Sequence, residues 1–184
     1  MKKAILGSFA ALAFSAGMAA AATVDIDFDS GVLSGGSYSE KGFTFTSSSR
    51  GGVSLASNCP TGTPNSKCLQ FNNDEIITVM FGDGAAFDVT GFLFNAPGNR
   101  GDIRISGGGL TQTLTEIYNG NTMSQATTND FDNITSFTFQ NAANGTGRVD
   151  NLSFEVAAVP VPAAGFLLLG GLGALGALRR RKRG

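Results

Sequence analysis

An alternation of apolar and polar residues through residues 23–158 narrows the possible folds more than any other feature of this sequence. In its first segment, Val24, Ile26 and Phe28 alternate with three aspartates. Successive side chains of a β-strand point to opposite faces, so the pattern predicts strands with one buried face. Similar patterns predict roughly ten strands in all, the others at residues 43–46, 53–55, 75–81, 87–94, 103–105, 110–117, 134–139 and 152–156.

Clusters of glycine, asparagine and serine separate these segments and have the composition of turns. The chain holds 26 Gly and 15 Phe, so phenylalanine is expected to supply much of the core. No segment between the two ends of the chain has a helical period. We therefore predict an all-β domain, built as a two-sheet antiparallel sandwich with jelly-roll-like connections.

Two segments allow finer predictions. Residues 75–81 are apolar at odd and even positions alike, which predicts a central strand that is covered on both faces. Within residues 87–94 the alternation changes phase at Thr90 and Gly91. A single extra residue shifts the phase in this way, so we predict a β-bulge there.

The charged residues are distributed unevenly along the chain. All 14 acidic residues lie between Asp25 and Glu155, where only six basic residues occur, so this region has a net charge of −8. Nucleic-acid binding needs a basic face to meet the phosphates, and the acidic domain argues against it. The other seven basic residues lie at the two ends of the chain.

Residues 1–22 have the three parts of a secretory signal peptide. Lys2 and Lys3 form the positive region, residues 4–14 are apolar, and the alanine-rich residues 17–22 supply a small-residue cleavage site. The alternative is an ordinary N-terminal helix, but the segment has no amphipathic period. We expect cleavage after residue 20, 21 or 22 and export of the domain at residues 23–158.

A second apolar segment, residues 163–178, lies near the C-terminus and carries no charge. As a helix it would rise about 24 Å, a little less than the thickness of a hydrocarbon core. A basic run follows directly, at Arg179, Arg180, Arg181, Lys182 and Arg183. By the positive-inside rule this run stops transfer and stays in the cytoplasm. We therefore predict a transmembrane helix with the acidic domain outside, the alternative being a buried core helix.

A proline motif precedes this span and consists of Val159, Pro160, Val161, Pro162 and Ala163. With the short Gly/Ala/Leu span and the basic end, the motif resembles the PEP-CTERM family of sorting signals. The match is closest to the proteobacterial variant with a Val-Pro-Leu-Pro-Ala core, although Val161 stands where that variant has Leu. The resemblance covers residues 159–184. The two prolines favour an extended strip, which a protease cleft can hold.

The resemblance implies a partner and a location. The partner is an exosortase, a membrane-embedded cysteine protease-transpeptidase that recognises the tail and cleaves it near the proline motif. Such tails occur in Gram-negative bacteria that export surface polysaccharide. The resemblance therefore implies transient residence in the inner membrane with the domain in the periplasm, and then transfer to the cell surface or the extracellular space.

Cys59 and Cys68 are the only cysteines and flank a loop rich in turn residues. In an exported chain two such cysteines are expected to form a disulfide. A catalytic or redox cysteine would need a base nearby, and the chain has no histidine. The same absence excludes Ser-His-Asp and Cys-His nucleophile pairs and the usual zinc sites. We expect no enzymatic activity.

Structural calcium is the only metal or cofactor for which the sequence gives a candidate site. Calcium takes hard oxygen ligands, and the candidates are Asp27, Asp29 and Asp150. Asp150 has the parity of apolar Leu152, which points it inward, where a carboxylate needs a cationic partner. The alternative is that Asp25, Asp27 and Asp29 form a solvated strand face and Asp150 caps a turn.

Three functions follow from these features. The first is an exported cell-surface or extracellular-matrix protein, sorted by its tail and associated with exopolysaccharide. The second is a carbohydrate-binding module, because Asp27-Phe28-Asp29 and Asp150-Asn151-Leu152 resemble short motifs of exported carbohydrate-binding jelly rolls. The third is a secreted hydrolase that uses two carboxylates. Against the second, only Tyr38 and Tyr118 offer polar aromatic surfaces for a sugar.

Overall fold

The computed structural model describes residues 21–57, 59, 66–82, 84–96, 102–115, 122–128, 130–142 and 145–157. Residues Ala21–Ala157 form one compact unit. The predicted signal peptide up to residue 20, the sorting motif at residues 159–163, the span at 163–178 and the basic run at 179–183 lie outside the described residues. Among the described residues there is no helix with the length and hydropathy needed to cross a bilayer.

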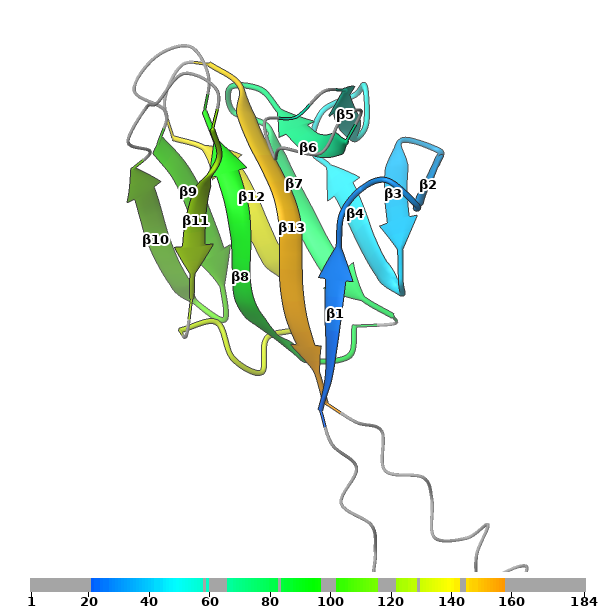
Figure 1. Ribbon diagram of the computed structural model, residues 1–184, viewed down its shortest axis with the longest axis vertical. Helices are drawn as coiled ribbons and strands as arrows, with labels where there is room; N and C mark the ends of the chain where they lie inside the picture. The colour runs from blue at the N-terminus through cyan, green and yellow to red at the C-terminus, as the bar shows by residue number, and fades with distance from the viewer. Residues whose placement is uncertain are drawn as a thin grey trace, which may run out of the picture. The chain divides into compact units, whose positions relative to one another are not determined.

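The first of two sheets, here called sheet A, has six antiparallel strands (Figure 1). Its order is β11, β8, β13, β6 and β5, and β1 also pairs with β13. The strands are β1 (Ala22–Ile26), β5 (Ser54–Ser57), β6 (Lys67–Phe71), β8 (Phe87–Asn95), β11 (Ser124–Thr127) and β13 (Gly147–Val156).

The second sheet, sheet B, has seven antiparallel strands in the order β10, β9, β12, β7, β4, β3 and β2. The strands are β2 (Val32–Ser34), β3 (Ser37–Glu40), β4 (Phe43–Ser47), β7 (Ile76–Phe81), β9 (Asp102–Gly107), β10 (Leu110–Thr115) and β12 (Phe137–Asn141). Between β4 and β13 the chain passes from one sheet to the other seven times. The predicted antiparallel two-sheet sandwich with jelly-roll-like connections is confirmed.

Phenylalanine fills the space between the sheets, as predicted. Of the twelve phenylalanines in the described residues, all but Phe81 are buried. Phe43 of sheet B stacks on Phe154 of sheet A, with ring centroids 4.1 Å apart and an interplanar angle of 19°. Phe87 of sheet A meets both rings edge to face, at 5.3 and 5.5 Å. This three-ring cluster joins the two sheets directly, and such aromatic contacts add to the free energy of simple burial.

The outer face of sheet B is polar and carries one hydroxyl side chain from each of its seven strands in a single cross-strand row. The row consists of Ser34, Ser37, Thr46, Thr78, Thr138, Ser106 and Thr111. On the same face of β7, Ile76 is 38% exposed and Met80 is 41% exposed. The strand at residues 75–81 is central, as predicted, but the prediction that both its faces are covered is wrong.

The predicted disulfide between Cys59 and Cys68 is confirmed, with a Cα–Cα distance of 5.9 Å. Both cysteines are buried, and Cys68 belongs to β6. The bond therefore fixes the chain before β6 to the strand itself.

Replacing both cysteines with serine is expected to lower the free energy of unfolding by about 2–3 kcal/mol, because the bond restricts the unfolded chain. Urea unfolding of the two proteins measures this difference. A reductant should lower the midpoint of the wild type to that of the variant and leave the variant unchanged. A wild-type midpoint that does not respond to the reductant would contradict the prediction.

Candidate functional site

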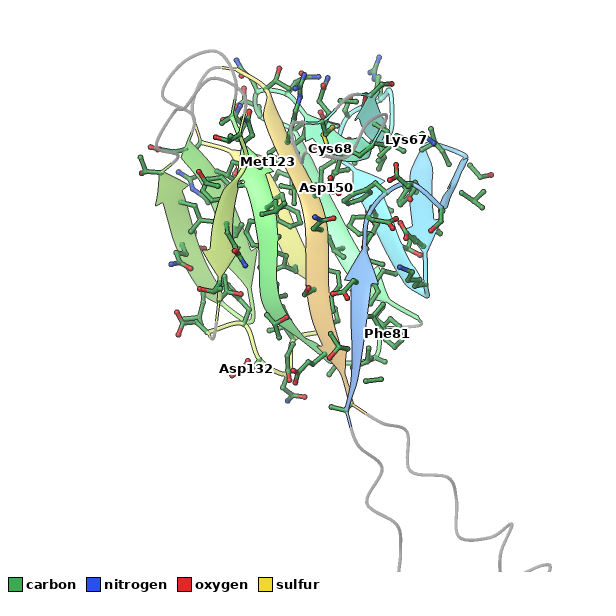
Figure 2. The ribbon with its side chains drawn as sticks, viewed as in Figure 1. Lys67, Cys68, Phe81, Met123, Asp132 and Asp150 are labelled. Carbon is green, nitrogen blue, oxygen red and sulfur yellow. A yellow bond between two sulfur atoms is a disulfide. The ribbon has the colours of Figure 1, made fainter. Side chains whose placement is uncertain are left out.

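The candidate site is built around an interruption in the pairing of β13. On one side β8 accompanies β13 along its length. On the other side, β6 pairs with residues 147–149 and β1 pairs with residues 152–156. Asp150 and Asn151 belong to neither of these two ladders. Asp150, labelled in Figure 2, therefore lies where β13 passes from one neighbour to the other.

Two bulges of opposite sense occur in the β8–β13 ladder at this point. From Asp150 to Ser153, β13 advances three residues while β8 advances two. From Ser153 to Phe154, β13 advances one residue while β8 advances two, which leaves Thr90 as the extra residue. The bulge predicted at Thr90 and Gly91 is confirmed, and the second bulge on β13 restores the register. Paired bulges redirect side chains locally without shifting the rest of the ladder.

Asp150 points inward, as its parity predicted, and is 1% exposed. The N–H of Asn151 donates to its carboxyl group at 2.8 Å. Burial, and then the negative charges of Asp29, Asp27 and Glu40, raise the pKa of Asp150 to about 7, although the Asn151 hydrogen bond acts in the opposite direction. The four carboxyl groups therefore interact electrostatically, although they come from three distant parts of the sequence.

Glu40 is the second buried acid of this region and has several partners. Its carboxylate accepts hydrogen bonds from the N–H of Phe28 at 3.1 Å, the hydroxyl of Ser30 at 2.9 Å and the hydroxyl of Tyr38 at 2.7 Å. Lys41 adds an ion pair at 3.5 Å. Burial, and then the hydrogen bond to Glu40, raise the pKa of Tyr38. Buried charge that is paired in this way holds the loop after β1 against β3.

Asp27 and Asp29 lie just after β1 and not within it. Phe28 between them has φ of 59° and is fully buried, so the predicted strand ends at residue 26. The N–H of Asp29 donates to Asp27 at 3.1 Å, and Asp29 accepts the N–H of Lys67 at 2.8 Å. The Asp29 N–H is also the main reason that the pKa of Asp27 is lowered. A solvated strand face therefore describes Asp25 but not the other two acids. Asp27 holds the loop together, and Asp29 ties the loop to β6.

The fit of these acids to calcium is mixed. The charges favour a cation, because Asp150 is buried and is affected by the negative charges of three other carboxyl groups. The geometry is less favourable, since the described residues contain no group of three acidic side chains placed to hold one ion. The backbone N–H groups that donate to Asp27, Asp29 and Asp150 each occupy one carboxylate oxygen. Calcium at Asp27, Asp29 and Asp150 therefore stays a prediction.

Calcium is expected to raise the midpoint of thermal unfolding at pH 8, because a cation bound only to the folded state stabilises it. At a calcium concentration about 100 times the dissociation constant, the free energy of unfolding should increase by about 2.7 kcal/mol. Calorimetry with calcium and with a chelator measures it. Magnesium at equal concentration is the control, because it demands tighter octahedral geometry. Equal midpoints with calcium and with chelator would remove calcium from the description of this site.

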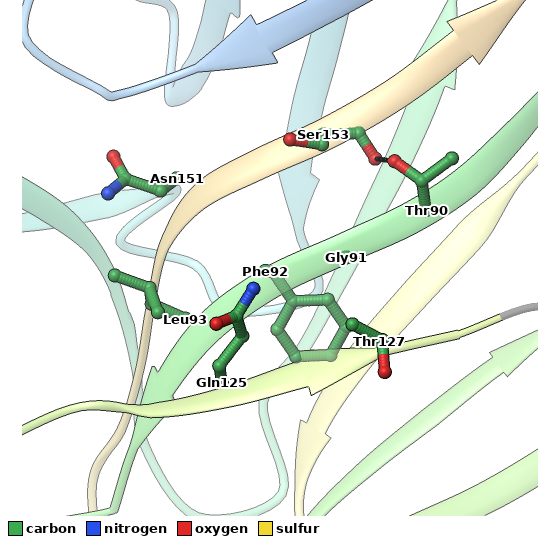
Figure 3. Close-up of a pocket in the computed structure, with 8 residues that line it drawn as sticks. All are labelled: Thr90, Gly91, Phe92, Leu93, Gln125, Thr127, Asn151 and Ser153. Atoms are coloured by element: carbon green, nitrogen blue, oxygen red, sulfur yellow. Dashed lines mark hydrogen bonds between the residues drawn. The ribbon is translucent and has the colours of Figure 1, made fainter.

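A pocket of about 400 Å³ opens on the outer face of sheet A, over the paired bulges (Figure 3). Gln125 and Thr127 of β11 line one side, and Asn151 and Ser153 of β13 line the other. The middle strand β8 lies between them. No pattern in the sequence predicted this pocket. Thr90 and Gly91 marked one of the two bulges that form it, but the opposing residues could not be assigned without the register.

A comparison with protein-family models finds no family that matches this chain, and a comparison with curated proteins finds no similar sequence.

Proposed function

We propose that this chain is an exported cell-surface or extracellular-matrix protein, sorted through its C-terminal tail by an exosortase and associated with exopolysaccharide. The pairing of Ala22 with Val156 carries the proposal. Because of it, the chain enters and leaves the sandwich at one end, and the two segments proposed to direct export and sorting continue in sequence from that end. Asp150 is six residues from Val156 along β13, or about 20 Å at the rise of a strand. Asp150 and the neighbouring pocket residue Asn151 are thus remote from the attachment point.

Two further features agree with export. The disulfide between Cys59 and Cys68 is of the kind that persists in oxidising compartments. The acidic residues of the chain all lie between the two targeting segments, whereas both segments carry the basic residues that signal peptides and cytoplasmic flanks require. Charge and cysteine chemistry therefore support the same topology.

The proposal includes no catalytic activity. Asp150 has a pKa of about 7, in the range of a general acid. Its side chain is 1% exposed and does not line the pocket, so its carboxyl group has no access to a substrate there. Gln125, Asn151 and the hydroxyl residues that do line the pocket offer binding groups and no nucleophile with a base.

Mass spectrometry of the mature protein from its native host tests the proposal. The expected N-terminus lies between Ala21 and Thr23, and the expected C-terminus lies at residues 159–164. In a host that lacks the sorting enzyme, the tail should be intact and the protein held in the inner membrane. Replacing Pro160 and Pro162 with alanine should also leave the tail intact, whereas Thr111→Ala, on the outer face of sheet B, should not. A cytosolic protein that retains Met1 would overturn the proposal.

A further inference from the structure

The pocket on sheet A is formed by two cross-strand rows. In one row, Gly91 of β8 lies between Thr127 and Ser153. In the other, Leu93 lies between Gln125 on β11 and the bulged Asp150–Asn151 segment of β13. Because Asp150 is turned inward and Asn151 has φ of 47°, the amide of Asn151 is exposed on the outer face. Hydroxyl groups therefore flank a glycine, and amide groups flank a leucine.

Gly91 makes the hollow possible. A Cβ atom at this position would approach the carbonyl oxygen of Ala126 to 2.9 Å, so a larger residue would push β11 away from β8. Glycine within a strand often marks a place where another molecule approaches the backbone closely. The paired bulges hold this glycine between two strands that each present a hydroxyl group.

The polar groups of the pocket are partly committed and partly free. The hydroxyl of Thr90 donates to the carbonyl of Ser153 at 2.9 Å, and the hydroxyl of Ser153 donates to Asp25, so both hydroxyl oxygens remain as acceptors. The side-chain amides of Gln125 and Asn151 make no hydrogen bond to another described residue. Each amide offers two N–H donors and a carbonyl acceptor. The pocket thus presents donors and acceptors side by side.

The chemistry of the lining argues against anionic ligands. No residue that lines the pocket is charged. Asp25, the next residue in the row beyond Ser153, is acidic and would repel an anion. An anionic ligand would lose hydration without gaining a charged partner, which is unfavourable. Leu93 adds an apolar surface between the two amides, suited to the C–H groups of a small neutral molecule.

We propose that this pocket binds a neutral sugar unit of a polysaccharide. The neighbouring hydroxyl groups of a sugar donate and accept hydrogen bonds at the same time. They therefore match the N–H donors and carbonyl acceptors of the Gln125 and Asn151 side chains, while Leu93 contacts the C–H face of the sugar. The inference deepens the proposed function, because it rests on the association with polysaccharide and names the site. The one aromatic side chain that lines the pocket, Phe92, is 2% exposed and Tyr38 is buried elsewhere in the core. Without stacking on an aromatic ring, a single sugar unit binds weakly, and several copies of the chain that bind one polymer would compensate by multivalency.

The test uses the full-length chain in a detergent without a sugar headgroup. The probes are neutral hexasaccharides of glucose, mannose and galactose, and a galacturonate hexamer as the anionic probe. We expect saturable binding of at least one neutral probe, with chemical-shift changes at the side-chain amides of Gln125 and Asn151, and no binding of the anionic probe. Gln125→Ala combined with Asn151→Gly should weaken binding about five-fold or more, since two hydrogen-bonding groups are lost.

The variants have matched controls. Gln112 is an exposed glutamine on the edge strand β10 of the other sheet, so Gln112→Ala should leave binding unchanged. Glycine at position 151 tolerates φ of 47°, so the double variant should keep its unfolding midpoint. Failure of all neutral probes to bind, stronger binding of the galacturonate hexamer, or equal binding by the double variant would each overturn the inference. Processing of the two chain ends does not involve the pocket, so the proposed function fails or stands separately, on mass spectrometry.

Discussion

Asp150→Asn is expected to raise the free energy of unfolding at pH 8, by at most about 4 kcal/mol. Burial raises the pKa of the Asp150 carboxyl group to about 7 in the folded protein, from an ordinary value of 3.8. At pH values between these two pKa values, the Asp150 carboxyl group keeps its proton in the folded protein but has released it in the unfolded protein. The free energy of unfolding of the wild type should therefore fall as pH rises from about 4 to about 7, by about 1.4 kcal/mol for each unit of pKa shift. Asparagine keeps the shape and the acceptor for the Asn151 N–H but does not ionise.

Urea unfolding from pH 4 to pH 8, in the presence of a chelator, measures this effect. The difference between the two proteins should be small at pH 4 and should grow until about pH 7. Asp132, labelled in Figure 2, is exposed, so Asp132→Asn should follow the wild type at every pH. Parallel pH profiles for wild type and Asp150→Asn would show that Asp150 is ionised in the folded protein across this range, contrary to the prediction.

Phe154→Ala should lower the free energy of unfolding by about 3–5 kcal/mol, the range found when a buried aromatic residue is replaced by alanine. Phe154 is fully buried, stacks on Phe43 across the two sheets and meets Phe87 edge to face. Removing its ring leaves a cavity at the contact that joins sheet A to sheet B. Its neighbours belong to two hydrogen-bonded sheets, so they have little freedom to close the space.

Phe81→Ala is the matched control for this change. Phe81 also contacts Phe43, with ring centroids 4.7 Å apart, but it is only partly buried. Solvent can fill part of the space that its ring leaves, so the loss of stability should be well below that of Phe154→Ala. Equal losses, measured as shifts in the urea midpoint at an unchanged slope, would contradict the view that the three-ring cluster joins the sheets.

Alternation in the sequence predicts a strand well where one face of that strand is packed with large side chains. Phe43 and Phe45 of β4 show this, as do Phe137 and Phe139 of β12, and all four are buried. Strand β11 was missed because it lies at an edge and buries only Ala126. An edge strand gains less from burial, so its sequence can be polar throughout.

Three other strands were missed for different reasons. In β3 the inward residues are Tyr38 and Glu40, so the buried face is not marked by apolar residues alone. In β6, Cys68 and Leu69 are adjacent and both buried, which hides the alternation. The disulfide explains the first of them, because the cysteine is held by its bond to Cys59 and not by the pleat. In β2, Val32 and Leu33 are both exposed at an edge of sheet B, so neither marks an inward face. Alternation of apolar and polar residues does not reveal a strand whose side chains are not positioned by packing against the core.

The candidate site shows the same limit of sequence patterns. The inward direction of Asp150 follows from its parity with Leu152 in one strand, and the prediction was confirmed. The pocket depends on the register of β8 against β13, where Thr90 bonds to Ser153 across 63 residues. The bulges of β8 and β13 form a hollow only because they lie next to each other in the sheet. A pattern within one strand cannot supply that pairing, which is set by packing of the whole sandwich.

The place of β13 in sheet A has a mechanical consequence. β13 is the last strand of the described chain and lies in the interior of its sheet, bordered by β8 on one side and by β6 and β1 on the other. The hydrogen bonds of antiparallel strands run perpendicular to the strands. A pull on the chain beyond Ala157, directed along β13, would load these bonds in parallel, as shear, and would not open them one at a time. A sandwich held from this end should resist stretching better than one held by an edge strand.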